Sequence, residues 1–274
     1  MSLLQAILLG IIQGLTEFLP ISSSAHLVIA PFLLNWQLDP QIIFTFDVLV
    51  QNGTLVAVVI YFWKDLWAIL RAFVLGLMRR QPFTDPVSRL GWFILLASLP
   101  AGILGILVKP FVEAAFHSVL ATSLFLGVTA ILLLMAEWLG RRTRPLESIR
   151  WLDALVMGFF QALAIFPGIS RSGATISGGM LRNLDRRAAA RFSFLMSVPI
   201  MLAAGGLETL DALKIPNVTH FLLPILAGFT AAAVTGYLAI HWLLGYLQKH
   251  PLGWFAVYCL LAGGLTIAVY FLRG

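Results

Sequence analysis

The chain has 274 residues, of which 60% are hydrophobic and only 11% are charged, and its mean hydropathy is +0.94. Water-soluble domains carry roughly 25% charged residues, so this composition excludes a soluble globular protein and indicates an integral membrane protein. The net charge of +6 favours basic loops on the cytoplasmic side of a membrane over a nucleic-acid partner. The single cysteine, Cys259, excludes an intrachain disulfide framework and a multi-cysteine metal site.

The chain begins with an apolar stretch, residues 3–30, that is interrupted in its middle. Gln13, Glu17 and Pro20 break the apolar run, so a cleaved signal peptide is not expected. Pro20 and the serines at 22–24 disfavour a continuous helix. Irregular backbone at membrane depth is tolerated only where protein or water satisfies its polar groups. The stretch is therefore predicted to be a re-entrant helical hairpin.

The remaining apolar stretches repeat this arrangement. A span needs about 20 mostly apolar residues, and three uninterrupted stretches meet this requirement after the first hairpin. A second interrupted stretch, 151–181, contains the sequence PGISRSG at 167–173 and is also predicted to be a re-entrant hairpin. Three further spans follow it. The six predicted spans are 42–62, 91–109, 118–138, 188–208, 220–247 and 252–272.

The two halves of the chain resemble each other at an offset of 148 residues. Residues 10–26 and 158–174 share seven identities in seventeen positions without a gap. The matches include Gln and Ser, which are not chance agreement of apolar residues, although convergent composition of two hairpins is the alternative explanation. We therefore predict one membrane domain, 1–274, built from repeats at 1–145 and 146–274.

Each repeat contains one hairpin and three spans. Three is an odd number, so the second repeat enters the membrane in the opposite orientation. The predicted fold class is an all-α integral membrane protein with six transmembrane helices and two re-entrant hairpins in an inverted repeat. Such folds place their binding site near the bilayer midplane, on broken helices at the repeat interface.

The basic residues divide unequally between the two sides of this topology. Three of them, Lys109, Lys214 and Arg273, fall on one side. The other side receives fourteen: Lys64, Arg71, Arg79, Arg80, Arg89, Arg141, Arg142, Arg144, Arg150, Arg182, Arg186, Arg187, Arg191 and Lys249. The positive-inside rule makes the second side cytoplasmic and places both termini outside.

Both hairpins carry polar side chains that are costly inside a membrane. An ionisable group at membrane depth costs about 2.5–3.5 kcal/mol on insertion scales, so each one suggests a functional site. The candidates in the first hairpin are Gln13, Glu17, Ser22, Ser23, Ser24 and His26. The candidates in the second hairpin are Gln161, Ser170, Arg171, Ser172 and Thr175. A further polar interruption begins at Gln51 and either lines the same cavity or marks a helix kink.

This set of residue types suits phosphate chemistry. Arginine binds phosphate oxygens through two points, and helix N-termini bind anions. A serine beside a histidine can be an activated nucleophile. A carboxylate beside an amide, such as Glu17 and Gln13, can hold Mg²⁺ or Ca²⁺ through oxygen atoms. The alternatives are a purely structural ion pair between Glu17 and Arg171, a buried structural His26, and serines that only cap helices.

Two motifs identify a resemblance to a known family. Residues 13–26, QGLTEFLPISSSAH, resemble the glutamate-rich motif of the bacterial undecaprenyl-diphosphate phosphatases, the bacitracin-resistance family. Residues 167–175, PGISRSGAT, with Gln161 and the run SGGM at 177–180, resemble the second motif of that family. The resemblance covers nearly the whole chain.

The resemblance implies an inner-membrane enzyme that converts undecaprenyl diphosphate to undecaprenyl phosphate with Mg²⁺ or Ca²⁺, recycling the lipid carrier of cell-wall synthesis. It implies that Glu17 is a metal ligand or an acid/base, and that Arg171 binds the diphosphate. Ser23 and His26 are implied as nucleophile and base, and which of them attacks stays open. Ser22, Ser24, Gln51, Gln161, Ser170, Ser172 and Thr175 are expected to contact the substrate. The expected site faces the outside.

One residue departs from the family pattern. Many members have a second glutamate where this chain has Gln13, which can ligate a metal but cannot act as a base. Glu17 is therefore the only acidic candidate in its hairpin. The alternative function is a prenyl-phosphate flippase or transporter, since inverted repeats with broken helices are also a transporter architecture. A non-catalytic scaffold would not explain the two matched polar tips. A homodimer stays open as the assembly.

Overall fold

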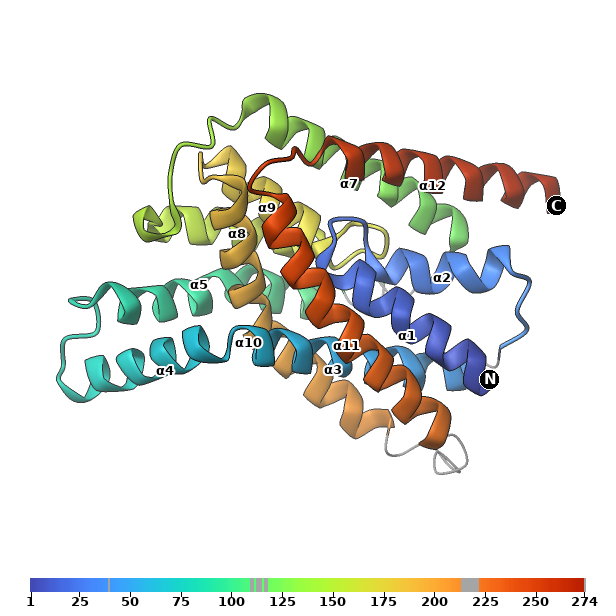
Figure 1. The fold of residues 1–274 in the computed structure, drawn as a ribbon, viewed down its shortest axis with the longest axis horizontal. Coiled ribbons are helices and arrows are strands. Elements are labelled where there is room, and N and C mark those ends of the chain that lie inside the picture. The colour runs from blue at the N-terminus through green and yellow to red at the C-terminus, as the bar shows by residue number, and fades with distance from the viewer. Residues whose placement is uncertain (39, 109–110, 112–114, 116–117, 213–221, 274) are drawn as a thin grey trace.

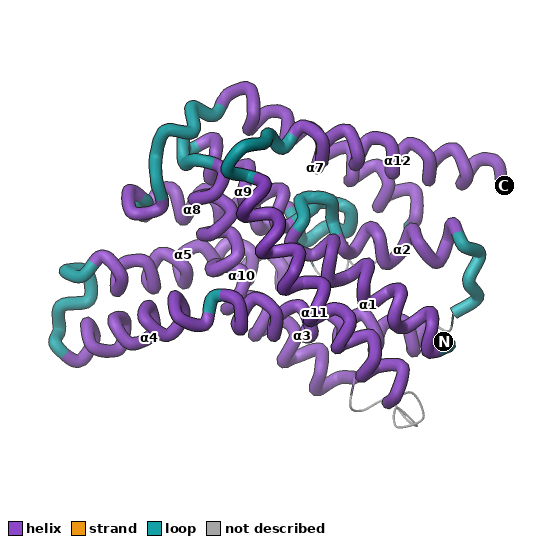
Figure 2. The backbone as a smooth tube through the Cα atoms, viewed as in Figure 1, coloured by secondary structure: helices purple, strands orange, loops and turns teal. Residues whose placement is uncertain are grey.

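The computed structural model describes residues 1–273 except 39, 109–110, 112–114, 116–117 and 213–221. Lys109 and Lys214, two of the predicted outer basic residues, lie outside the described residues. The described residues fold into eleven α-helices joined by short loops (Figure 2). The predicted all-α class is therefore confirmed.

Six helices belong to the first half of the chain (Figure 1). They are α1 (Leu3–Phe18), α2 (Ser23–Leu33), α3 (Pro40–Tyr61), α4 (Trp63–Met78), α5 (Pro86–Leu107) and α7 (Val119–Leu139). The second half begins with a short 3-10 turn, η1 (Leu146–Ser148), and then contributes five helices. They are α8 (Trp151–Leu163), α9 (Arg171–Leu181), α10 (Arg186–Ala212), α11 (Leu222–Tyr246) and α12 (Gly253–Arg273).

Five of these helices, α5, α7, α10, α11 and α12, are long and apolar enough to cross a membrane. They match five of the six predicted spans, and the chain is a multi-pass membrane protein. The sixth predicted span, 42–62, corresponds to α3, which qualifies only together with α4, from which it is bent by 77°. The sequence did not predict α4 as a helix, because Lys64, Asp65 and Arg71 interrupt its apolar residues.

Both interrupted stretches are broken where the sequence predicts. The first stretch divides into α1 and α2, and the second divides into α8 and α9. In both, a serine begins the following helix: Ser22 accepts a hydrogen bond from the backbone N–H of Ala25, and Ser170 accepts one from Gly173. These caps satisfy helix N–H groups that would otherwise lack partners at the break.

Glycines allow the first helix of each half to pack closely against a helix of the other half. A Cβ on Gly10 of α1 would lie 2.3 Å from the carbonyl oxygen of Gly228 in α11. A Cβ on Gly158 of α8 would lie 2.6 Å from the carbonyl oxygen of Ala97 in α5. Membrane helices associate through such small residues because lipid supplies little hydrophobic drive. Gly10 and Gly158 are also partners in the 148-residue offset.

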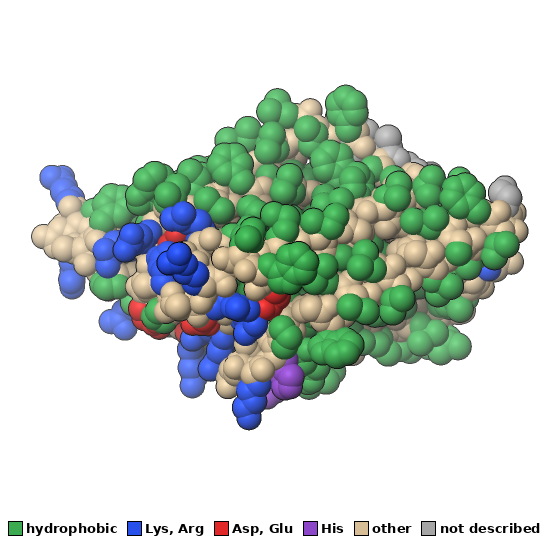
Figure 3. Space-filling model, turned by 90° about the horizontal axis from the view of Figure 1, so that it is seen from above, with side chains coloured by type: hydrophobic (Ala, Val, Ile, Leu, Met, Phe, Trp, Pro, Cys, Tyr) green, Lys and Arg blue, Asp and Glu red, His purple; other side chains and the backbone are tan. Residues whose placement is uncertain are grey.

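Ion pairs connect several loops at one end of the molecule. Glu137 pairs with Arg142 and Arg186, and its carboxylate also accepts a hydrogen bond from the backbone N–H of Leu252. Figure 3 shows Lys and Arg side chains gathering toward one end of the visible face, while hydrophobic side chains cover most of the rest. Both chain termini lie toward the opposite end (Figure 1).

A second cluster at this end depends on Asp153. Its side chain is fully buried, and its carboxylate accepts hydrogen bonds from Arg144 at 2.7 Å and Arg182 at 2.8 Å. Arg144 also donates to the backbone carbonyl oxygens of Ser148 and Arg182. Asp153 therefore joins the start of α8 to the loop that precedes it and to the end of α9.

We predict that Asp153→Asn lowers the free energy of unfolding by about 2–4 kcal/mol, because it removes the counter-charge of two partly buried arginines. Thermal unfolding in detergent measures this change. Glu147→Gln is the matched control, since Glu147 is exposed and its substitution also removes one negative charge. Equal melting temperatures for the two variants would contradict the structural role of Asp153.

Candidate active site at the two helix breaks

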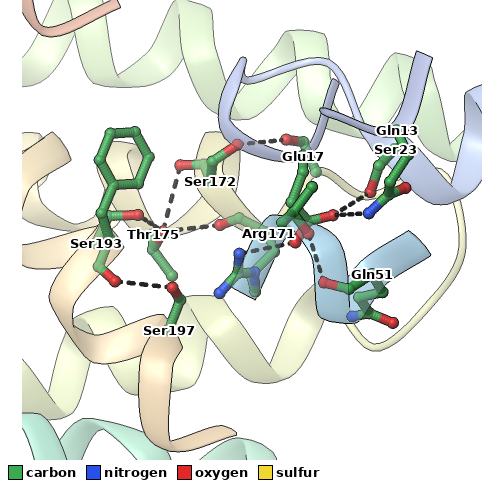
Figure 4. Close-up of polar contacts among 12 residues, drawn as sticks. Gln13, Glu17, Ser23, Gln51, Arg171, Ser172, Thr175, Ser193 and Ser197 are labelled. Carbon is green, nitrogen blue, oxygen red and sulfur yellow. Dashed lines mark hydrogen bonds and ion pairs between the residues drawn. The ribbon is translucent and has the colours of Figure 1, made fainter. Parts of the chain in front are cut away.

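The loops that interrupt the two broken stretches contact each other directly (Figure 4). Ser172 donates a hydrogen bond to the backbone carbonyl of Leu19 at 3.0 Å. In the opposite direction, the backbone N–H of Gly168 donates to the hydroxyl of Ser24 at 3.4 Å. Ser24 and Ser172 occupy equivalent positions in the 148-residue offset. The two tips are therefore joined by a reciprocal pair of serine–backbone contacts.

Unusual backbone conformations shape both tips. Ser22 has φ +70°, a left-handed conformation that non-glycine residues adopt at a cost. Gly168 has φ +101°, and a Cβ at this position would lie 2.3 Å from the carbonyl oxygen of Thr122. Thr129 of α7 fixes the second tip, because its hydroxyl donates to the Gly168 carbonyl and accepts from the Ser170 N–H.

Glu17 lies at the centre of the joined tips. One carboxylate oxygen accepts a hydrogen bond from Ser23 at 2.5 Å and another from the Gln13 side-chain amide at 3.0 Å. The other oxygen accepts from the Arg171 guanidinium at 2.8 Å. Gln13, Glu17, Ser23 and Arg171 thus form one polar centre from both halves of the chain (Figure 4). The two broken stretches therefore meet at this centre.

The polar centre has hydrogen-bond donors that are available to an anion. Nη1 of Arg171 is buried and has no hydrogen-bond partner among the described residues, although Nη2 of the same side chain binds Glu17. Ser23 and Arg171 are also the first residues of α2 and α9. Helix N-termini carry partial positive charge and free N–H groups. A phosphate at this centre would meet a guanidinium donor, a serine hydroxyl and the ends of two helices.

His26 faces away from this centre. Its Nδ1 bonds to the backbone carbonyl of Ser22 at 2.7 Å, and its Nε2 bonds to the hydroxyl of Tyr258 at 2.7 Å. No contact between His26 and Ser23 or Glu17 is present among the described hydrogen bonds. Sequence reasoning missed Tyr258, since it lies within the uninterrupted apolar span 252–272 and nothing there marks it as functional.

The remaining predicted residues have mainly structural partners. Ser22 and Ser170 cap helices, while Thr175 donates to the backbone carbonyl of Arg171 and contacts Ser193 at 2.6 Å. Gln161 donates to the carbonyl of Ala97 in α5, and its side-chain oxygen, Oε1, is buried without a partner in the described part of the chain. Thr175 and Ser193 thereby connect Arg171 to α10.

The close-up places Gln51 on α3 near the polar centre (Figure 4). Its backbone carbonyl accepts a hydrogen bond from Thr54, as expected near a local irregularity of a helix. Among the described hydrogen bonds, none joins the Gln51 side chain to Glu17 or Arg171.

The oxygen atoms of Glu17, Gln13 and Ser23 are the donors available for a divalent cation. The described residues contain no group of three His, Cys, Asp or Glu that could hold a metal ion by themselves. Mg²⁺ commonly binds through one or two carboxylates with phosphate oxygens supplying other ligands. The donor set therefore fits a cation that arrives with a phosphorylated substrate better than a metal held by protein alone.

The fold and the centre together define a class: a multi-pass helical membrane protein with a polar centre built where two helices are broken. The sequence profile of the bacitracin resistance protein BacA matches residues 6–265. The chain belongs to this family.

Relatives with the name undecaprenyl-diphosphatase match almost the full chain. The protein of Chlorobaculum tepidum is 44% identical, with 98% of both chains covered. The protein of Thermomicrobium roseum is 43% identical over 98% of both chains, and that of Moorella thermoacetica is 44% identical over 100% of both.

We predict that Gly168→Ala abolishes phosphate binding at the centre, because the added methyl group would clash with the Thr122 carbonyl and because the backbone at this position is left-handed. Binding of inorganic phosphate, followed by calorimetry in detergent, measures this effect. Gly127→Ala is the matched control, since a Cβ at Gly127 of α7 meets nothing within 4 Å. Unchanged phosphate binding in Gly168→Ala would contradict the proposed shape of the tip.

Proposed function

We propose that this protein is an undecaprenyl-diphosphatase that removes the terminal phosphate of undecaprenyl diphosphate. The observation that carries the proposal is the Glu17 carboxylate, which binds Ser23 and Arg171 at once while Nη1 of Arg171 remains free. Phosphoryl transfer requires a general base, a nucleophilic hydroxyl and a positively charged group that binds phosphate. Glu17, Ser23 and Arg171 would supply these three groups. The name of the relatives, undecaprenyl-diphosphatase, supports the same substrate.

In the proposed first step, the Ser23 hydroxyl attacks the terminal phosphorus. Its proton passes to Glu17, whose oxygen lies 2.5 Å from the Ser23 oxygen. A bond forms between the Ser23 oxygen and phosphorus, and the bond from phosphorus to the bridging oxygen breaks. Undecaprenyl phosphate leaves with the electron pair of that bond. Ser23 is favoured over His26 as nucleophile because Ser23 contacts a base, whereas the Nε2 atom of His26 already has Tyr258 as its partner.

In the proposed second step, water attacks the phosphorylated Ser23. Glu17 accepts a proton from the water and returns its own proton to the departing serine oxygen. Inorganic phosphate leaves, and Glu17 then loses the remaining proton to solvent. Arg171 holds the phosphate oxygens in both steps through Nη1, and the N-termini of α2 and α9 stabilise the charge that develops.

A divalent cation, Mg²⁺ or Ca²⁺, is part of the proposal. Glu17 and Gln13 lie one helical turn apart on α1 and would supply protein oxygen atoms to it, with the diphosphate supplying others. The cation would neutralise phosphate charge that Arg171 does not reach.

We further propose the inverted-repeat arrangement, with 1–145 and 146–274 as repeats and with both broken stretches as re-entrant hairpins. The 148-residue offset relates α1 to α8 and α3 to α10, and the order of the helices along the chain relates α5 to α11. The helices of each half pack against the other half in the same pattern: α1 and α3 contact α11, while α8 and α10 contact α5. The equivalent glycines, Gly10 and Gly158, each make a close backbone approach in the contacts of α1 with α11 and of α8 with α5.

The proposed location is the bacterial inner membrane, with the termini and the site facing outside. The ion pairs of Glu137 and Asp153 bring together basic loops that the sequence assigns to the cytoplasmic side. Both termini lie toward the other end, where α1 begins (Figure 1). The first broken stretch therefore approaches the centre from the end that is assigned to the outside.

We expect Glu17→Gln and Arg171→Ala each to lower phosphate release from undecaprenyl diphosphate in detergent by about 10²–10³-fold, because each removes a group that acts on the transferring phosphate. Arg187→Ala is the control, since Arg187 is an exposed arginine at the basic end. Full activity in either site variant would exclude its proposed role. Transfer of labelled lipid across liposomes without hydrolysis by the wild type would favour the transporter instead.

Gln13→Glu tests the cation. A second carboxylate strengthens the attraction for a divalent ion, so we expect the cation concentration for half-maximal activity to fall by roughly two- to tenfold. Titration of Mg²⁺ and Ca²⁺ after chelation measures it. Gln5→Glu, a glutamine-to-glutamate change in the first turn of the same helix α1, provides the charge-matched control. An unchanged cation requirement in Gln13→Glu would place the ion away from Gln13.

A further inference from the structure

The imidazole of His26 is fixed through both of its nitrogen atoms. A backbone carbonyl can only accept a hydrogen bond, so Nδ1 must carry a proton to bond the Ser22 carbonyl at 2.7 Å. In the neutral ring, Nε2 then holds a lone pair and accepts the hydroxyl proton of Tyr258, also at 2.7 Å. The structure thus specifies one tautomer, with the proton on Nδ1.

The same contacts tie His26 to the tip that carries Ser23. The Ser22 carbonyl accepts both the backbone N–H and Nδ1–H of His26. Ser22 is the residue with φ +70°, and the next residue, Ser23, bonds to Glu17. The orientation of the imidazole is therefore coupled through one backbone turn to the proposed nucleophile.

Tyr258 reaches this position from the far end of the chain, 232 residues after His26. Its ring stacks on the imidazole with centroids 5.6 Å apart and planes 10° from parallel. Stacking alone would be available to a phenylalanine. A phenol hydroxyl in an apolar setting costs free energy unless it is hydrogen-bonded, and its bonding partner here is the free nitrogen of His26.

We propose that Tyr258 is a positioning residue that fixes the imidazole of His26 against the Ser22 carbonyl and thereby holds the turn that carries Ser23 beside Glu17. This proposal rests on the proposed diphosphatase function. Tyr258 acts through His26 and not on the phosphate. Its hydroxyl donates to Nε2 and so keeps the imidazole in the orientation in which Nδ1–H bonds the Ser22 carbonyl.

Tyr258→Phe isolates the hydroxyl, because phenylalanine keeps the stacked ring. The matched control is Tyr270→Phe, a tyrosine of the same helix whose ring lies beside Phe32 and not beside His26. Both proteins are prepared full length in detergent with ¹⁵N-labelled histidine. The chain has five histidines, so the His26 signals are assigned by their loss in a His26→Gln protein.

The ¹⁵N spectrum of the imidazole provides a readout that a change in helix packing would not produce. We expect wild type and Tyr270→Phe to show His26 with Nδ1 protonated and Nε2 unprotonated. Tyr258→Phe should keep Nδ1 protonated, because the Ser22 carbonyl still requires it, but should shift the Nε2 signal, because this nitrogen loses its hydrogen-bond donor. We also expect kcat for phosphate release to fall about tenfold in Tyr258→Phe with KM changed less than about twofold, because the lost bond orients a catalytic group and does not bind substrate.

Two results would overturn the proposal while leaving the diphosphatase function intact: an unaltered His26 spectrum in Tyr258→Phe, or wild-type kcat in that variant. Equal losses in Tyr258→Phe and Tyr270→Phe would also overturn it, since a general loss of packing would then explain both. A wild-type protein that releases no phosphate would instead overturn the proposed function, and the positioning role of the His26–Tyr258 pair with it.

Discussion

Glu17 and Arg171 lie 154 residues apart, and their ion pair joins the two halves of the protein inside a membrane. The Glu17 side chain is 6% exposed and the Arg171 side chain 19%, so neither charge has full access to water. Removal of one partner of such a pair costs about 3–5 kcal/mol, because the remaining charge is left without compensation. The arrangement of the tips therefore has to keep these two groups together until a phosphate takes over one of them.

Several weaker contacts meet this requirement. The reciprocal contacts of Ser24 and Ser172 hold the two tips at a fixed distance, and Thr129 fixes the shape of the second tip. Gly10 and Gly158 let the helices that carry the tips approach their partners closely. Among the described residues, Nη1 of Arg171 has no partner while Nη2 binds Glu17, so one nitrogen remains for a ligand.

Much of this arrangement follows from local sequence. The breaks after α1 and α8 are predictable because proline, glycine and serine act on the backbone within a few residues. The meeting of Glu17 with Arg171 is predictable because charges at membrane depth need partners. The helix α4 was not predicted, since its charged residues hide an amphipathic pattern, and the 77° bend before it depends on packing.

Which residues a polar side chain of the tips binds is less predictable from the sequence than the fact that it has a hydrogen-bond partner. Sequence spacing brings His26 close to Ser23, but the ring turns to Ser22 and Tyr258 because the left-handed backbone at Ser22 directs its carbonyl toward the imidazole. Tyr258 and Thr129 lie in uninterrupted apolar spans, where a hydroxyl gives no local signal. Contacts between residues so distant in sequence become visible only once the helices are packed.

The central claim is that phosphate binds between the two tips and not at either one alone. A structure of the protein with orthovanadate, a phosphate analogue, tests it most directly. The account predicts that the anion contacts Nη1 of Arg171 from the second half and the Ser23 oxygen from the first half. An anion bound elsewhere, with the Glu17–Arg171 pair and its free nitrogen unchanged, would contradict it.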